Sequence, residues 1–335
     1  MRSRFVGWTV VMAAVMLLLC GGGLPETVTT ASAQTVIKLG TTSAYDTPET
    51  LALKEFSRLV GERTKGQVRV DVLAAGSAGG EREIAEGLQI GTMHMALLGG
   101  ILQNFDPAMM ILEWDLLFKN DEHVKAAMYG PIGERIRKRL LEKTKIRTMA
   151  IFMRTPRLLT TNKPVNSLND LKGMKIRVPE MPARVAIWRA LGARPTPMAA
   201  PEIVTGLTLG TIDGQENPAS LIYSRKIYDA VKYLAVTNHL YGFMLVVASD
   251  RFFSQLAPET QKILQQAAID AGQYNDASLK ASEAGEMEKL SKLMKITRPD
   301  MGPWREAAKD VYKQFSSTEG FVNLYHAIAE EGKKY

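Results

Sequence analysis

Short strand-like and helix-like segments alternate along the chain from residue 35 onward, and this alternation limits the fold more than any other feature. The helical segments of the first half begin at Pro48, Glu81 and Asp121, and we expect the last of them to run unbroken to Leu141. The strands expected between them are residues 35–40, 68–72, 93–98 and 146–152. This order predicts an α/β fold with mainly parallel strands, because each helix returns the chain to begin a parallel neighbour.

The second half repeats the alternation and adds one unusually long helical pattern. A strand over residues 175–178 is followed by a helix over residues 182–191, and residues 233–249 contain one strand or two. Residues 260–294 are helical in pattern, broken at most around Gly272. At about 1.5 Å per residue such a helix exceeds the width of one domain. We therefore expect it to brace two domains.

Two α/β lobes joined by crossovers of the chain predict a two-lobed clamshell. The first lobe is expected to comprise residues 34–154 and 243–282, and the second residues 155–242 and 283–335. Ligands of such folds bind at the carboxyl ends of the strands, in the crevice between the lobes.

The first 33 residues have the layout of a signal peptide. Arg2 and Arg4 precede the apolar run of residues 10–19, and residues 31–33 read Ala-Ser-Ala. We expect cleavage after Ala33 and export to the periplasm. A retained N-terminal anchor is the alternative, and lipid attachment at Cys20 is a third reading that the large preceding residue disfavours.

Composition excludes several classes of function. Four His and one Cys are too few for zinc sites built from Cys and His or for a disulfide framework, and no cofactor is predicted. No nucleophile elbow, phosphate-binding loop or zinc-protease helix occurs. The net charge of +7 favours anionic partners, and export argues against nucleic acid.

Two arginines stand where a surface residue is not expected. Arg177 lies within an apolar strand, and Arg157 begins another. A buried arginine needs a carboxylate or an anion to hold, and its planar fork suits a carboxylate. The partner is either a bound acid or a carboxylate of the chain itself, for which the candidates are Glu180, Asp213 and Glu216.

Asn217 is the last polar residue of a second dense polar motif, residues 213–218, which reads Asp-Gly-Gln-Glu-Asn-Pro. A residue before proline favours an extended conformation at the start of a helix. Asn217 therefore either caps the helix that follows or donates a hydrogen bond to a ligand.

Four stretches in this order resemble a known family. Residues 79–83 read Gly-Gly-Glu-Arg-Glu, residues 167–179 contain Ser-Leu-Asn-Asp-Leu-Lys-Gly-Met-Lys-Ile-Arg-Val-Pro, residues 191–198 read Leu-Gly-Ala-Arg-Pro-Thr-Pro-Met, and residues 210–218 end in Asp-Gly-Gln-Glu-Asn-Pro. Together they are similar to the solute-binding proteins of tripartite ATP-independent periplasmic (TRAP) transporters, of the DctP type. The resemblance covers the whole chain after the signal peptide.

The resemblance implies a function and a set of ligand contacts. It implies the two-lobed clamshell of periplasmic binding proteins and a protein that is not an enzyme. The two lobes would close around a small organic acid, such as a dicarboxylate. The protein would then deliver this acid to a membrane permease. Arg177 falls on the family's main carboxylate clamp and Arg157 on a second contact. Asn217, Glu81 and Thr42 fall on further polar contacts.

Departures from the family pattern suggest three more candidates. Glu180 follows the clamp strand, where it can accept from hydroxyl or ammonium groups, and Tyr45 and Phe243 are candidate walls of the pocket. The carboxylate itself stays open among C4-dicarboxylates, 2-oxo acids, sugar acids and aromatic acids.

Two other classes of function compete with transport. One is the ligand-binding subunit of an envelope sensory system, which would share the same site. The other is an envelope enzyme with an anionic substrate, for which Glu81 or Glu180 would serve as the general base without an evident partner.

Overall fold

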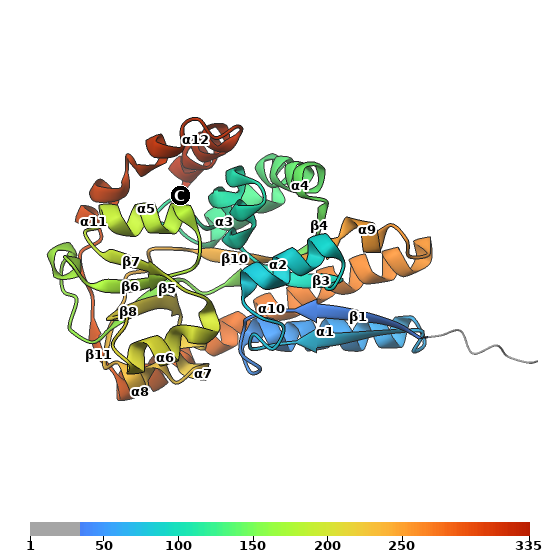
Figure 1. Cartoon of the computed structure of the whole chain (residues 1–335), viewed down its shortest axis with the longest axis horizontal. Coiled ribbons are helices and arrows are strands. Elements are labelled where there is room, and N and C mark those ends of the chain that lie inside the picture. Colours follow the sequence, from blue (N-terminus) through green and yellow to red (C-terminus); the bar gives the residue numbers. More distant parts are fainter. Residues whose placement is uncertain (1–33) are drawn as a thin grey trace, which may run out of the picture. The chain divides into compact units, whose positions relative to one another are not determined.

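The computed structural model describes residues 34–335, apart from the side chains of residues 280, 281 and 283. The predicted signal peptide lies outside the described residues. Residues 34–335 form two β-sheets with helices packed against both, as Figure 1 shows, which confirms the predicted α/β class.

The first sheet has five strands in the order β2-β1-β3-β10-β4. Its strands are β1 (Thr35–Gly40), β2 (Val68–Leu73), β3 (Met95–Leu98), β4 (Ile146–Arg154) and β10 (Gly242–Ser249). Strand β1 pairs in parallel with β2 and β3, whereas β10 runs antiparallel to both β3 and β4. All residues of β10 are buried, because it has a neighbour on each side and both faces of the sheet are covered.

The second sheet has six strands in the order β11-β9-β5-β8-β6-β7. Its strands are β5 (Arg157–Thr161), β6 (Lys175–Val178), β7 (Arg194–Pro197), β8 (Gly214–Pro218), β9 (Tyr233–Ala235) and β11 (Lys295–Thr297). Strand β5 is antiparallel to β8 and β9. Each sheet therefore contains a strand antiparallel to its neighbours, which the expectation of mainly parallel strands did not include.

Twelve α-helices and six short 3₁₀-helices connect the described strands. The α-helices are α1 (Pro48–Arg63), α2 (Glu81–Ile90), α3 (Asp121–Tyr129), α4 (Pro131–Thr144), α5 (Pro182–Ala190), α6 (Ile203–Thr208), α7 (Ala219–Ser224), α8 (Ile227–Ala230), α9 (Asp250–Phe253), α10 (Pro258–Leu293), α11 (Gly302–Ala308) and α12 (Phe321–Glu331). The 3₁₀-helices are η1 (Gly100–Asn104), η2 (Pro107–Glu113), η3 (Leu168–Leu171), η4 (Ala200–Glu202), η5 (Val311–Phe315) and η6 (Gly332–Lys334).

The single helix expected over residues 121–141 is two helices. Gly130 is extended, and it serves both as the C-cap of α3 and as the N-cap of α4. Pro131 then occupies the first turn of α4, where its missing N–H leaves no hydrogen bond unmade. The apolar periodicity continues across the break, which is why the pattern alone suggested one helix.

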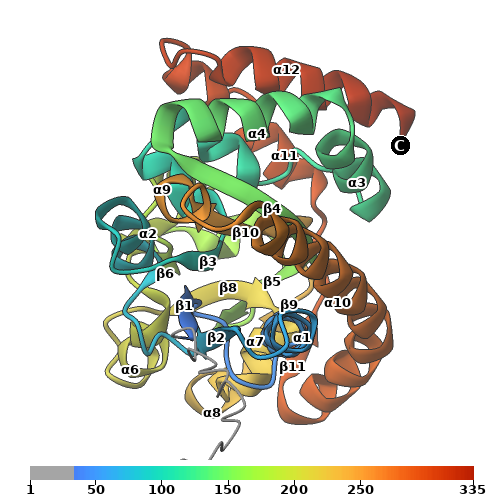
Figure 2. The same ribbon diagram turned by 90° about the vertical axis from the view of Figure 1, so that its right-hand side faces the viewer.

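Helix α10 has 36 residues and braces the two sheets, as predicted. Leu264 and Ala268 lie in the core between the first sheet and α1. Leu290 lies in the core of the second sheet, beside α7. Figure 2 shows α10 beside α1 and curving past both sheets. One helix thus contributes to two separate hydrophobic cores.

The division between the lobes stays a prediction. The crossovers near Arg154 and Gly242 coincide with the passage of the chain between the sheets. Helix α12, assigned to the second lobe, packs against α3, α4 and η2, which were assigned to the first (Figure 2). No helix within residues 34–335 combines the length and the apolar character that a membrane span requires.

Candidate functional site

Polar side chains from both sheets converge on a small cavity at the ends of β1, β4 and β6. Its volume is about 30 Å³, less than that of two other grooves of about 590 and 370 Å³, but it gathers more charged groups than either. Its polar lining residues are Thr42, Ser43, Glu81, Glu113, Arg154, Arg157, Arg177, Glu180 and Asn217.

Arg177 is a buried cation in this cavity, and no described carboxylate pairs with it. It lies in β6 between Ile176 and Val178, with 3% of its surface exposed. Its Nε donates to the carbonyl oxygen of Met198 at 2.8 Å. Burial lowers the pKa of Arg177 to about 10, so it remains protonated at neutral pH. The other two nitrogens of the fork make no hydrogen bond to a described residue, which leaves them available to a carboxylate.

Arg157, in contrast, pairs with a carboxylate of the chain. Its Nε donates to the carboxylate of Glu216, and its Nη2 donates to Glu216 Oε1 at 3.0 Å and to the Glu216 carbonyl at 2.7 Å. The same carboxylate is 2.5 Å from Arg184 Nη2 and 3.2 Å from His239 Nε2. Burial alone would raise the pKa of Glu216, but the two guanidiniums hold it well below its usual value. Glu216 therefore fixes Arg157 at the edge of the cavity.

Asn217 does not cap the helix that follows it. It is the fourth residue of β8, and Pro218 occupies the N-cap position of α7. Its Nδ2 donates to Gln215 Oε1 at 2.5 Å, and Gln215 Nε2 donates to Thr160 Oγ1 at 2.7 Å. This chain of hydrogen bonds orients the Asn217 amide toward the cavity.

The first sheet contributes a hydroxyl and a carboxylate. Glu81 begins α2, directly after the glycine that caps the helix, and Thr42 follows β1. Thr42 Oγ1 donates to Glu81 Oε1 at 3.2 Å. Burial, together with the negative charge of Glu113, raises the pKa of Glu81, although Arg154 and Arg177 oppose the shift.

Glu180 lines the cavity and also contacts the first sheet's helices. Its carboxylate is 3.5 Å from Arg82 Nε in α2. Asn104 Nδ2 donates to the Glu180 carbonyl at 3.1 Å. Glu180 is thus part of the contact between the two halves of the site.

Neither Tyr45 nor Phe243 lines this cavity, although Phe243 lines a neighbouring pocket with Glu113, Arg154 and Arg157. Tyr45 is 57% exposed, on a turn that points it to solvent. Phe243 is 1% exposed and packs edge-on against Phe118, with ring centroids 6.2 Å apart. It belongs to the hydrophobic core because its strand, β10, is buried on both faces. The expectation that these two side chains wall the pocket is corrected on this point.

Two charged residues of the cavity were not predicted from the sequence. Arg154 ends β4, and its Nε donates to Glu49 Oε1 at 2.8 Å. Glu113 ends η2 between the buried residues Leu112 and Trp114. Both are charged residues beside apolar neighbours, which is the signal that identified Arg177. Within residues 34–335, no group of His, Cys, Asp and Glu side chains is arranged to hold a metal ion.

The chain matches one protein family over most of its length. Residues 39–318 match the family model of the DctP proteins, described as bacterial extracellular solute-binding protein, family 7. The chain belongs to this family. A solute-binding protein of Roseobacter denitrificans is 36% identical over 275 residues, which are 82% of this chain and 85% of the relative. The 2,3-diketo-L-gulonate-binding periplasmic protein YiaO of Escherichia coli is 32% identical over 256 residues, 75% of this chain and 77% of the relative.

Solved structures of DctP-type proteins have the same fold. The crystal structure of a TRAP periplasmic solute-binding protein from Roseobacter denitrificans, with bound L-galactonate, is 33% identical with a TM-score of 0.84, and the match covers 89% of this chain and 99% of that one. One from Haemophilus influenzae, with bound L-gulonate, is 29% identical with a TM-score of 0.84, covering 89% and 100%. The resemblance to TRAP solute-binding proteins and the two-lobed fold are thereby confirmed.

Proposed function

We propose that this chain captures a small polyhydroxylated carboxylate, a sugar acid, between its two lobes. The observation that carries the proposal is Arg177, a buried arginine with two free nitrogens in a cavity that further polar and charged side chains also line. Its guanidinium would bind the ligand carboxylate, with Arg157 and Asn217 beside it. Glu81, Thr42 and Glu180 would accept from or donate to the hydroxyl groups.

The similar structures support a sugar acid over the other carboxylates. Those with bound L-galactonate and L-gulonate each hold a six-carbon acid with one carboxylate and several hydroxyl groups. A relative from Bacillus subtilis named as a C4-dicarboxylate-binding protein is 27% identical, less than the Roseobacter denitrificans relative at 36%. The polar lining of the first sheet in this chain suits hydroxyl groups, because carboxylate oxygens accept from them.

Closure of the lobes would complete the site. Arg225 donates to the carbonyl oxygens of Thr42, at 2.6 Å, and Ala200, at 2.5 Å, which belong to different lobes in the predicted division. Together with the Arg82–Glu180 pair, this contact would favour a closed state. Ligand binding would shift the population toward that state, because only there can both halves contact the ligand.

The proposed setting is the bacterial periplasm. The chain would be exported by the signal peptide of residues 1–33, with cleavage after Ala33, and would deliver its ligand to the membrane permease of a TRAP transporter. Membership of an extracellular solute-binding family supports this setting.

A thermal-shift and calorimetry panel tests the proposal. The chain from Gln34 onward is unfolded and refolded to remove carried-over ligand, then mixed with L-galactonate, L-gulonate and the amide of each acid. A ligand at 100 times its dissociation constant adds about 2.7 kcal/mol to the unfolding free energy, which raises the midpoint by roughly 4–8 °C for a chain of this size. We expect a shift with an acid and none with its amide. Equal shifts with acid and amide, or none with any acid, would contradict the proposal.

A further inference from the structure

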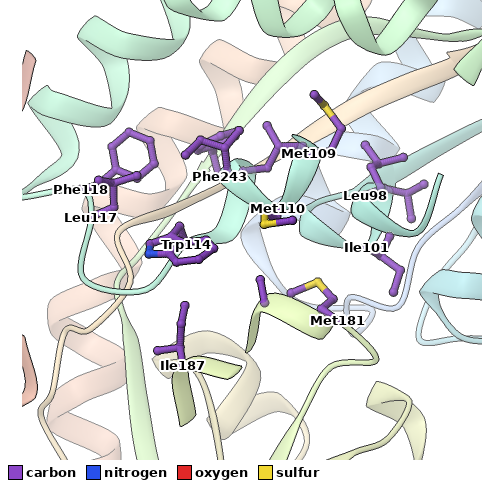
Figure 3. Close-up of a cluster of buried hydrophobic side chains, with 14 of the residues drawn as sticks. Leu98, Ile101, Met109, Met110, Trp114, Leu117, Phe118, Met181, Ile187 and Phe243 are labelled. Atoms are coloured by element: carbon purple, nitrogen blue, oxygen red, sulfur yellow. The ribbon is translucent and has the colours of Figure 1, made fainter. Parts of the chain in front are cut away.

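Glu113 is a buried carboxylate at the cavity with no hydrogen-bond donor among the described residues, although its charge interacts with that of Arg184. It is 6% exposed and makes no hydrogen bond or ion pair with the described residues. Its neighbours Leu112 and Trp114 belong to the largest hydrophobic core, and Figure 3 shows Trp114, Met110 and Ile101 in that cluster. A carboxylate surrounded by such groups loses its hydration and requires a donor from elsewhere.

Two consecutive glycines make room for this carboxylate. A Cβ atom on Gly99 would overlap Oε1 of Glu113. A Cβ atom on Gly100 would lie 2.8 Å from Glu113 Cβ and 3.0 Å from Met181 Sδ. The backbone therefore packs directly against the Glu113 side chain and holds it beside the cavity. The position of Glu113 is therefore fixed by backbone packing, unlike that of a carboxylate at the surface.

The cations of the cavity are already neutralised, with one exception. Arg154 pairs with Glu49, and Arg157 pairs with Glu216. Arg177 alone has no carboxylate partner among the described side chains. The cavity therefore offers strong binding to one carboxylate group of a ligand.

The carboxylates of the cavity have a different distribution. Glu180 pairs with Arg82, and Glu81 accepts from the hydroxyl of Thr42. Glu113 has no donor and lies close enough to Glu81 for the two charges to interact. A second carboxylate on the ligand, placed away from Arg177, would meet the negative charges of Glu81 and Glu113, whereas a hydroxyl group would supply a donor.

We propose that Glu113 determines ligand specificity, accepting a hydrogen bond from a ligand hydroxyl and rejecting acids that carry a second carboxylate. The inference rests on the proposed function, because it requires the ligand's first carboxylate to bind at Arg177. It narrows the ligand class to hydroxylated monocarboxylates. A hydrogen bond to a buried carboxylate changes the dissociation constant by about 10- to 100-fold.

The first test varies the ligand and leaves the protein intact. L-Galactonate and galactarate share their carbon number and internal hydroxyl groups, and galactarate has a carboxylate in place of the terminal hydroxymethyl group. Calorimetry at pH 7.5 should give a dissociation constant at least about tenfold lower for L-galactonate. Equal affinity for the two acids would overturn the inference.

The second test varies the protein. Glu113→Gln removes the charge and keeps the shape of the side chain, so it should weaken L-galactonate binding at least about tenfold. The difference in affinity between L-galactonate and galactarate should also become smaller in this variant. Glu113→Asp keeps the charge but withdraws it from the cavity, and should also weaken L-galactonate binding. Glu86→Gln is the control, because Glu86 is exposed on α2 and does not line the cavity. Circular dichroism verifies that each variant is folded.

The outcomes separate this inference from the proposed function. If wild-type protein binds L-galactonate, Arg177→Ala abolishes that binding and Glu113→Gln leaves it unchanged, only the role of Glu113 is overturned. If wild-type protein binds neither acid, both proposals fail. Should Glu113→Gln not fold, the comparison of the two acids on wild-type protein decides the matter.

Discussion

Replacement of Arg177 should separate ligand binding from folding stability. The perturbation is Arg177→Met, which keeps much of the side-chain volume and removes the charge. Arg177 is 3% exposed, and its only hydrogen bond to a described residue is from Nε to the Met198 carbonyl. The variant would therefore lose one internal hydrogen bond and the whole of the proposed carboxylate contact.

The magnitude of the binding loss follows from the two free nitrogens of Arg177. Each hydrogen bond between charged groups contributes roughly 1.5–3 kcal/mol. A complex of micromolar affinity has a binding free energy of about 8 kcal/mol. Loss of two such bonds should weaken binding by at least about 100-fold. Arg177→Lys should recover little, because a lysine lacks the planar fork.

The stability of the ligand-free protein should respond in the opposite direction. Burial lowers the pKa of Arg177 to about 10, so unfolded chains keep this proton to higher pH than folded ones. The buried charge therefore costs stability at neutral pH, and the cost falls as pH rises above about 10. Arg177→Met should leave the urea midpoint at pH 7.5 unchanged or raise it.

Calorimetry with L-galactonate and urea unfolding monitored by circular dichroism measure the two effects. Arg194→Met is the matched control, because Arg194 is an exposed arginine of the adjacent strand β7. Unchanged affinity in Arg177→Met, or an equal loss in the control, would refute the assignment of Arg177 as the carboxylate contact. A large drop in stability would instead show that Arg177 has a structural partner.

Three further predictions concern buried charge and helix packing. Glu216→Gln should lower the unfolding free energy by about 3–5 kcal/mol in urea, because the buried Arg157 loses its counter-charge and Arg184 keeps only Asp115. The exposed Glu288→Gln should change it by less than about 1 kcal/mol, and similar values for both would contradict the network. The pKa of Glu81 is raised above 4.5, so its negative charge lowers the stability of the folded protein as pH rises above that value. The midpoint of thermal denaturation of Glu81→Gln should therefore rise relative to that of wild type between pH 4.5 and 7.5. Gly285→Ala should stabilise α10 by about 0.5–1 kcal/mol. Gly272→Ala should not stabilise it, because a Cβ atom on residue 272 would lie 3.1 Å from a backbone oxygen of β4. An equal gain in unfolding free energy for the two variants would refute this close approach.

Local signals predicted most of the helices and strands. Proline in the first turn located α1 and α5, and helical periodicity located α10, each to within a few residues. The same signals missed the break at Gly130, and they left open whether residues 233–249 contain one strand or two. There the structure has β9 in the second sheet and β10 in the first. Sheet membership depends on pairing between distant strands, which local patterns do not contain.

The residues of the candidate site were likewise predicted only in part from the sequence. Arg177 could be found because a charged residue within an apolar strand is unusual in any fold. Glu113 and Arg154 show the same signal less clearly, since each follows an apolar run near its end. Tyr45 and Phe243 were suggested only as candidate walls, and the structure puts one at the surface and the other in the core.

The sequence by itself determined the α/β class, the long bracing helix, the resemblance to TRAP solute-binding proteins and the importance of Arg177. These depend on periodicity, on residue type and on order along the chain. Only the tertiary structure decided which arginine has a free fork, because the choice depends on which carboxylate lies within reach. Arg157 and Glu216 are 59 positions apart and meet because β5 and β8 pair antiparallel. Arg177 lies on the neighbouring strand of the same sheet, where it lines the cavity and no described carboxylate is close enough to form an ion pair with it.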